Sequence, residues 1–304
     1  MDSPKQILNG MPDCPLCNSG GVSLYWGSVW RREEMRVLRC RECEVLFLWP
    51  PLLEEEAAEY YAHYSRHLHQ RGVAENETPE KTFQRRSRGG RYRVEIAKRF
   101  LKKGDAILDI GGGCGNFLVD IGRENPDSRA VLVESCREHL EFAREALRIE
   151  GYEDVENVQG SFNAIFLFHI LEHIVAPAPF LKRCSELLVE DGLVIVEVPC
   201  SRDPLISLYE SAPYKDFYFQ PMHPYTHCSR SLDVLFRGSG FEPVRFIPFQ
   251  RYPLSNHLQW LSNAVQGGNA GFAEMLGTEC EEAYKRRLEM SGFTDTLFGI
   301  FRKG

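Results

Sequence analysis

Short apolar segments alternate with amphipathic segments of helical spacing from residue 104 onward, and this alternation limits the possible folds more than any other feature. It is typical of an α/β fold, a mainly parallel sheet with helices on both faces. Ligands of such sheets bind beyond the carboxyl ends of the strands. The predicted strands are 106–111, 129–134, a weak third at 155–159, 164–170, 193–199 and 242–249; the predicted helices are 116–125, 136–151 with Gly151 as its stop, 179–192 and 229–240.

Two CxxC pairs stand near the N-terminus, Cys14 with Cys17 and Cys40 with Cys43. Each pair can form a knuckle whose thiolates reach one ion, and two knuckles close a tetrahedral site that suits Zn²⁺. Aromatic and β-branched residues between the pairs favour strands, as in a zinc ribbon spanning residues 1–50. Because four thiolates leave no open position, we expect the zinc to be structural.

The ten cysteines are interpreted as metal ligands or buried thiols rather than disulfides. The first residues, MDSPKQILNGMPDC, lack the basic and apolar regions of a signal peptide. No apolar run of about 18 residues exists, so no membrane span is expected. We therefore expect a cytoplasmic protein.

Residues 51–103 are charged and are predicted to form a helical linker or lid. From Lys81 to Lys103 the chain carries ten Lys and Arg residues and one acid, Glu95. Such a run suits the phosphates of a nucleotide-linked substrate or an RNA, and it equally suits the polar side of a helix. The net charge of -7 argues against a protein that coats nucleic acid.

The segment LDIGGGCGNF occupies the first strand-to-helix turn. Glycines let the backbone approach a ligand, but NAD, FAD and S-adenosylmethionine (SAM) sites all use such a turn. Asp109 stands inside the motif, where dinucleotide folds usually carry an apolar residue. Glu134 ends the second strand, where a carboxylate can accept both ribose hydroxyls, and HILEHI follows the fourth strand.

With these three segments in order, residues 104–250 resemble the class I SAM-dependent methyltransferases. The resemblance implies a Rossmann-like core with SAM as cofactor, in which Asp109 organises the glycine loop and Glu134 holds the ribose. Asn163 replaces the usual Asp that opens the fourth strand, and the stretch before it is short, so no adenine contact is named. The cofactor-binding residues implied are Asp109, Gly111, Gly112, Gly113, Gly115, Asn116, Phe117, Glu134, Ser135, Phe168 and His169.

A narrower resemblance extends beyond the core. The cysteine module together with EVPCSRDPLISLYE, FYFQPMHPY and SNHLQWL resembles methyltransferases of sugar, surface-glycan and natural-product biosynthesis. It implies a small-molecule acceptor, with nucleotide-linked and lipid-linked sugars among the candidates. Residues 251–290 would be a helical insertion near the substrate, and residues 291–304 the last core strand.

Methyl transfer to a hydroxyl or carbon acid needs a base, and histidine is the usual one near neutral pH. We assign this role to His223, with Tyr225 beside it, His169 as a further catalytic candidate and His257 as a substrate contact. His173 shares the face of His169 if a helix begins there, and helix-start packing is the alternative for both. In QPMHPYTHC, Pro224 argues against a helical metal pair of His223 and His227.

Other functions remain open. The ribbon and the basic segment 81–103 would suit a methyltransferase acting on RNA or protein, although the acidic chain makes a nucleic-acid partner a weaker hypothesis. A SAM-binding zinc module without catalysis is a third hypothesis. An NAD enzyme is disfavoured by Asp109.

Overall fold

The computed structural model describes residues 11–51, 56, 77–87 and 89–304. Much of the predicted helical linker or lid, residues 52–55, 57–76 and 88, lies outside the described residues. Within the described residues, no helix combines the length and the apolar character needed to cross a bilayer.

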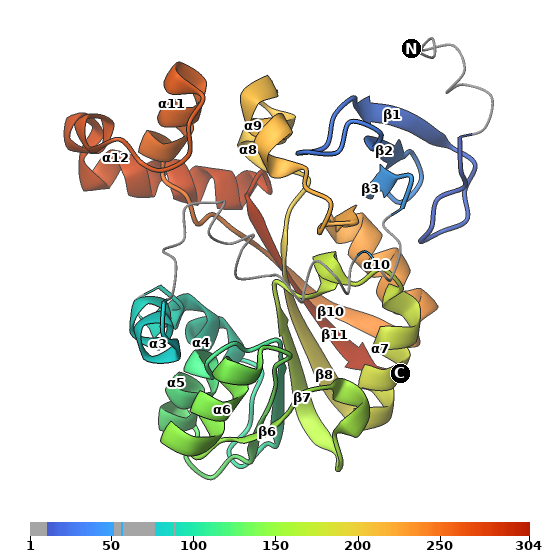
Figure 1. The fold of residues 1–304 in the computed structure, drawn as a ribbon, viewed down its shortest axis with the longest axis vertical. Coiled ribbons are helices and arrows are strands. Elements are labelled where there is room, and N and C mark those ends of the chain that lie inside the picture. Colours follow the sequence, from blue (N-terminus) through green and yellow to red (C-terminus); the bar gives the residue numbers. More distant parts are fainter. Residues whose placement is uncertain (1–10, 52–55, 57–76, 88) are drawn as a thin grey trace.

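A seven-stranded sheet forms the core, in the order β10-β11-β8-β7-β4-β5-β6 (Figure 1). The strands β4 to β8 pair in parallel, whereas β11 is antiparallel to both β8 and β10. The predicted mainly parallel sheet is therefore confirmed. The bounds are β4 (Ile107–Ile110), β5 (Ala130–Val133), β6 (Glu150–Tyr152), β7 (Phe162–Phe168), β8 (Leu188–Pro199), β10 (Phe241–Phe249) and β11 (Thr296–Lys303).

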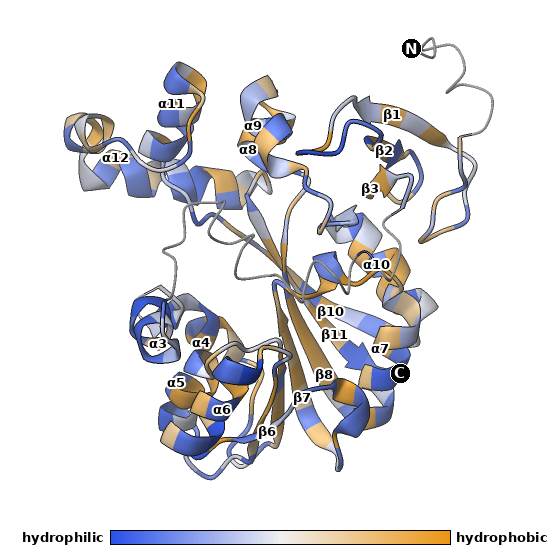
Figure 2. Cartoon of the chain, viewed as in Figure 1, coloured by the Kyte–Doolittle hydropathy of each residue, from blue (hydrophilic) through white to orange (hydrophobic). Residues whose placement is uncertain are grey.

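Helices cover both faces of this sheet, because its central strands are apolar on both sides. One face packs against α4 (Arg91–Ala97), α5 (Asn116–Glu124) and α6 (Arg137–Ala146), and the other against α7 (Pro177–Leu187) and α10 (Ser229–Gly238). Figure 2 shows apolar strands between helices whose outer faces are polar.

Two expectations about the third strand were wrong. Residues Val155–Asn157 form a 3₁₀ turn, and the third strand is β6, a few residues earlier. Gly151 does not stop a helix, because α6 ends at Ala146 and Gly151 lies inside β6. A Cβ there would meet Leu140 Cδ1 at 2.6 Å, so the glycine serves the close packing of β6 on α6.

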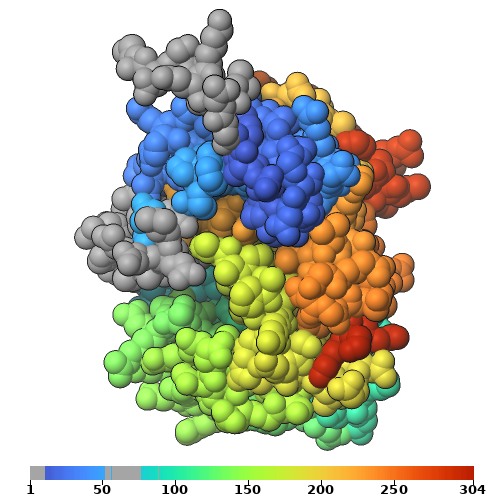
Figure 3. Space-filling model, turned by 90° about the vertical axis from the view of Figure 1, so that its right-hand side faces the viewer, coloured from blue at the N-terminus to red at the C-terminus, as the bar shows by residue number. Residues whose placement is uncertain are grey.

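The N-terminal strands β1 (Val22–Trp26), β2 (Arg36–Cys40) and β3 (Leu46–Trp49) form a second sheet. A strand from the C-terminal half of the chain, β9 (Tyr225–Thr226), completes it by pairing with β3. In the space-filling view the blue N-terminal strands sit directly on later segments of the chain (Figure 3). The ribbon is thus joined to the core by backbone hydrogen bonds two residues from His223.

Additional helices gather at the end of the sheet where β8 and β10 terminate (Figure 1). Two short ones follow β8, α8 (Pro204–Ser207) and α9 (Ala212–Tyr218). Two more separate β10 from β11, α11 (Leu254–Asn263) and α12 (Ala270–Ser291). These last two occupy most of residues 251–290, the segment expected to be a helical insertion.

Candidate active site

The glycine loop after β4 has a backbone that only glycine adopts without strain. Gly111 and Gly113 have φ angles of +72° and +60°. A Cβ on Gly111 would lie 2.0 Å from Ile170 Cδ1, and one on Gly113 would lie 2.4 Å from Arg86 Nη1. Gly115, in the left-handed conformation, precedes the first turn of α5. The loop therefore presents bare backbone at the carboxyl end of β4, next to a helix N-terminus.

Asp109 lies under this loop with 1% of its surface exposed. Both carboxylate oxygens are buried, and neither has a hydrogen-bond partner among the described residues. Burial raises the pKa of Asp109 to about 7, with Glu134 adding to the effect and Arg93 opposing it. Both oxygens can therefore accept further hydrogen bonds beneath the loop that the resemblance assigns to the methionine end of SAM.

Glu134 follows β5 and connects two loops. Its Oε2 accepts a hydrogen bond from the Gly113 backbone N–H at 2.7 Å, and its Oε1 accepts one from the Cys136 N–H at 2.7 Å. Each carboxylate oxygen can accept more than one bond, so both can still receive hydroxyl donors. The neighbouring Ser135 is exposed. This geometry suits the ribose role that the resemblance implies.

Helix α3 (Pro79–Ser87) lies over the glycine loop. Asn116, the first residue of α5, donates from Nδ2 to the Phe83 carbonyl and to Ser87 Oγ, both at 2.7 Å. Arg86 reaches Gly113 from the same helix. Asn116 thus lies at the loop, where the sequence places it, and its amide group anchors the helix above.

Phe117 and Phe168 are largely buried, with 7% and 8% of their surfaces exposed. Their rings are 4.8 Å apart and pack with Phe166 in the sheet core. The Arg93 guanidinium lies over the Phe168 ring at 4.9 Å, and its Nε donates to Glu197 Oε2 at 2.5 Å. One cation of the basic segment 81–103 is therefore partly buried and paired with a carboxylate.

His169 sits at the carboxyl end of β7 with a φ of +58°. Its Nδ1 is 3.1 Å from Glu172 Oε1, and its Nε2 is 3.3 Å from Glu197 Oε1 and 2.9 Å from Arg251 Nη1. Burial lowers the pKa of His169, but the carboxylates of Glu197 and Glu172 together raise it above its ordinary value. His169 is thus one member of a buried charge network rather than an isolated imidazole.

His223 lies beside His173, with ring centroids 4.6 Å apart in an edge-to-face arrangement. One nitrogen of each ring and one carboxylate oxygen of Glu172 all lie within 4.8 Å of one another. No α-helix spans 169–173: a 3₁₀ turn covers Leu171–His173, so the shared helical face considered for His169 and His173 does not form. The histidine close to His223 is His173, not His227.

The remaining histidine candidates are fully buried. His227 is 0% exposed and contacts Ser231 Oγ through Nδ1 at 3.2 Å, and burial lowers its pKa to about 4. His257 Nδ1 is 2.8 Å from the Tyr284 hydroxyl. Burial lowers the pKa of His257 to about 4, although the carboxylates of Asp295 and Glu281 act to raise it. His257 therefore contacts its own helical insertion.

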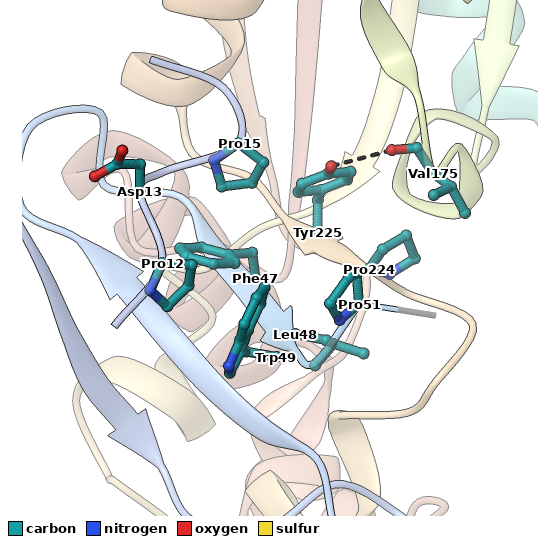
Figure 4. Close-up of a pocket in the computed structure, with 10 residues that line it drawn as sticks. All are labelled: Pro12, Asp13, Pro15, Phe47, Leu48, Trp49, Pro51, Val175, Pro224 and Tyr225. Carbon is teal, nitrogen blue, oxygen red and sulfur yellow. Dashed lines mark hydrogen bonds between the residues drawn. The ribbon is translucent and has the colours of Figure 1, made fainter. Parts of the chain in front are cut away.

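Tyr225 faces the ribbon. Its hydroxyl donates to the Val175 carbonyl at 3.1 Å, and its ring helps to line a pocket between the ribbon and the core, shown in Figure 4 with Phe47, Trp49 and Pro224. This differs from its expected place beside the acceptor, because β9 pairs with β3 and brings Tyr225 opposite Phe47 of the ribbon.

The four ribbon cysteines fit one zinc ion. The Sγ atoms of Cys14 and Cys43 are 3.5 Å apart, as are those of Cys17 and Cys40, and all four lie within 4.8 Å. A tetrahedral zinc bound at about 2.3 Å would separate its sulfurs by about 3.8 Å. None of the four forms a disulfide.

The charges around His169 come from distant parts of the sequence and were not predicted from it. Glu197, Arg93 and Arg251 are separated by 50 to 160 positions, roughly, and no local motif connects them. Glu197 is completely buried, which is rare for an acid without a charged partner, so its place in the apolar strand LVIVEVP was a usable signal of a cation beside it.

Residues 82–245, more than half of the chain, match the model of a protein family described as a methyltransferase domain. An (S)-coclaurine N-methyltransferase from Thalictrum flavum subsp. glaucum is 23% identical over 133 residues, 41% of this chain and 37% of that protein. A ubiquinone biosynthesis O-methyltransferase from Xanthomonas campestris pv. campestris (strain B100) is 29% identical over 109 residues, 33% of this chain and 46% of that protein.

This chain thus spans less than half the length of these two relatives. A solved structure of coclaurine N-methyltransferase bound to N-methylheliamine and SAH has a TM-score of 0.47 and 18% identity, over 76% of this chain and 75% of that chain.

Proposed function

We propose, because this chain belongs to the methyltransferase-domain family, that it transfers the methyl group of SAM to a small-molecule acceptor at the carboxyl edge of its sheet. The observation that carries the proposal is the grouping of Asp109, the bare backbone of Gly111 and Gly113, and Glu134 around one loop. The carboxylate of Asp109 would face the positively charged methionine part of SAM, and Glu134 would accept hydrogen bonds from its ribose. Both residues lie close to the N-terminus of α5.

SAM, when bound, supplies a methyl group on a sulfonium, and its transfer is an in-line displacement. The protein's main task is then orientation, which can supply up to about 7–11 kcal/mol of the barrier reduction. Glu134 would hold the ribose hydroxyls, and Asp109 would stabilise the positive methionine end. Because Gly111 packs against Ile170, the glycine loop is held next to the turn that carries Glu172 and His173.

The acceptor would bind above this turn, among Glu172, His173 and His223. We assign loss of the acceptor's proton to this cluster, with His223 as the residue on which turnover depends most. The polar character of the cluster suits a hydroxylated acceptor, such as a sugar or a related biosynthetic intermediate. The helices that follow β8 and β10 would enclose it (Figure 1).

A small acceptor is favoured over RNA by the basic segment. Arg93 is bound by Glu197, and Arg85 Nη2 is 2.8 Å from Glu77 Oε2. Lys98 and Lys103 also pair with carboxylates, so four of its ten cations already have carboxylate partners. We further propose that the ribbon zinc is structural, since all four ligand positions are taken by cysteines.

The test is transfer of labelled methyl from SAM to a panel of sugars, nucleotide-linked sugars, phenols and amines. We expect turnover with a hydroxylated acceptor and its strong loss in His223→Ala, with SAM affinity unchanged within a few-fold. SAM binding without transfer to any acceptor would contradict the enzymatic proposal. Lost SAM affinity in His223→Ala would assign that histidine a structural role.

A further inference from the structure

We propose that Glu172, His173 and His223 form a second metal site, separate from the ribbon, that binds a divalent transition cation of the zinc type. Two imidazoles and one carboxylate bind zinc and similar transition cations more tightly than they bind Mg²⁺ or Ca²⁺, which take oxygen ligands. The ligands come from two segments far apart in sequence, the 3₁₀ turn after β7 and the loop after α9. The catalytic use of this site rests on the function proposed above, but binding of the cation does not.

The spacing of the donors fits one ion. Their ligand atoms all lie within 4.8 Å of one another. A cation held at about 2.1 Å by tetrahedral ligands separates them by about 3.4 Å. The most distant pair of donors therefore needs to approach by up to about 1.4 Å, which side-chain rotation supplies.

The tautomer of His173 is suited to metal binding. Its Nδ1 lies 2.9 Å from the Met222 carbonyl oxygen, which can only accept, so Nδ1 carries the hydrogen. The lone pair of the ring is then on Nε2. Histidine ligands of metals commonly donate their other N–H to a backbone carbonyl in this way. Met222 precedes His223, so the same loop orients one ligand and supplies another.

Glu172 supplies a buried carboxylate that can accept a further ligand. Only 1% of its surface is exposed, and its Oε1 is engaged by His169 Nδ1 at 3.1 Å. Its Oε2 is buried and has no hydrogen-bond partner among the described residues. An unsatisfied buried carboxylate oxygen is costly, and a cation beside two imidazoles would satisfy it.

Three protein ligands leave a coordination position open, as in catalytic rather than structural zinc sites. A cation here would lower the pKa of an acceptor hydroxyl beside it, whose proton would pass to solvent. The acceptor oxygen would then form its bond to the methyl carbon as the carbon–sulfur bond of SAM breaks, with that electron pair remaining on sulfur. As a ligand, His223 would give its lone pair to the cation rather than to a proton.

The experiment counts metal in tag-free, full-length protein that has been loaded with Zn²⁺ or Co²⁺ and then dialysed. We expect one equivalent bound by the ribbon and a second that is lost in His173→Ala and in His223→Ala. Cys14→Ser should lose the ribbon equivalent and keep the second, and His139→Ala should keep both. With Co²⁺, the second equivalent should lack the sulfur charge-transfer absorption that cysteine ligands give.

A wild-type protein that binds only the ribbon equivalent would overturn the proposal, as would a second equivalent that persists in both histidine variants. Circular dichroism of His173→Ala and His223→Ala checks that loss of metal is not loss of fold. Methyl transfer that survives selective removal of the second metal would refute its catalytic use and leave the proposed function standing. Metal binding without methyl transfer would refute the proposed function alone.

Discussion

Glu134 accepts a hydrogen bond from the Gly113 backbone N–H at 2.7 Å, and this one contact joins the loops that follow β4 and β5. The same carboxylate accepts a second bond from the Cys136 N–H. The two loops that would hold the methionine and ribose parts of SAM are therefore fixed relative to each other before the cofactor binds. Binding then costs less ordering entropy than two independent loops would require.

Gly113→Ala should weaken SAM binding about tenfold or more, which is about 1.4 kcal/mol. The new Cβ would occupy a left-handed backbone position and meet Arg86 Nη1 at 2.4 Å, on the surface that the cofactor would approach. Calorimetric titration measures the change. Gly122→Ala in α5 is the matched control, because its Cβ meets nothing within 4 Å, and its SAM affinity should equal that of the wild type.

Asp109→Asn should stabilise the protein without cofactor at neutral pH, by a few kcal/mol at most. Burial raises the pKa of Asp109 from 3.8 to about 7, so the folded state holds this proton more tightly than the unfolded state. The charged form therefore costs stability, and that cost grows as pH rises from about 4 to 7.

Denaturant unfolding of both proteins from pH 4 to 8 tests this prediction. The advantage of Asp109→Asn should widen up to about pH 7 and then stay constant. An advantage that is independent of pH would show that the carboxyl group is not the cause.

Glu197→Gln should destabilise the fold by about 3–5 kcal/mol, because it leaves buried positive charge without its partner. Glu197 is fully buried and accepts from Tyr92 Oη at 2.7 Å as well as from Arg93, and His169 lies 3.3 Å away. Denaturant unfolding gives the value. Asp127→Asn is the control, because it breaks only the exposed pair with Lys103 and should change stability by less than about 1 kcal/mol. Equal effects of the two variants would contradict the account.

Cys43→Ser should release the ribbon zinc and lower the melting temperature, since metal binding contributes directly to folding of such modules. Because β3 pairs with β9, turnover should fall more than SAM affinity does. Cys280→Ser is the control, because Cys280 is exposed on α12. Metal content, melting temperature and SAM titration together check the prediction, and a zinc-free Cys43→Ser protein with unchanged melting would refute it.

The sequence predicted those parts of the site whose residues are neighbours in the chain. Asp109 and the glycines lie in one turn, and Cys14, Cys17, Cys40 and Cys43 lie in two knuckles, so local spacing was sufficient to identify them. Glu134 was predicted as a site residue because a strand end has a known place in a parallel sheet.

The acceptor side was harder to predict, because tertiary contacts build it. His173 and His223 are 50 positions apart and meet only when the loop after α9 folds back on the turn after β7. The sequence HILEH contained a hint, two histidines and an acid within five residues, but only the fold selects His173 as the partner of His223. Tyr225 turned toward the ribbon because β9 pairs with β3, a pairing without any local signal.

Titration of the wild-type protein and Glu134→Ala with SAM, by calorimetry, tests the central claim most directly. Glu138→Ala, an exposed acid in the first turn of α6, serves as the matched control, and NAD as the control ligand. We predict that the wild type and Glu138→Ala bind SAM alike, that Glu134→Ala loses this binding, and that NAD binds to none of them. Failure of the wild type to bind SAM, or undiminished affinity in Glu134→Ala, would contradict the account.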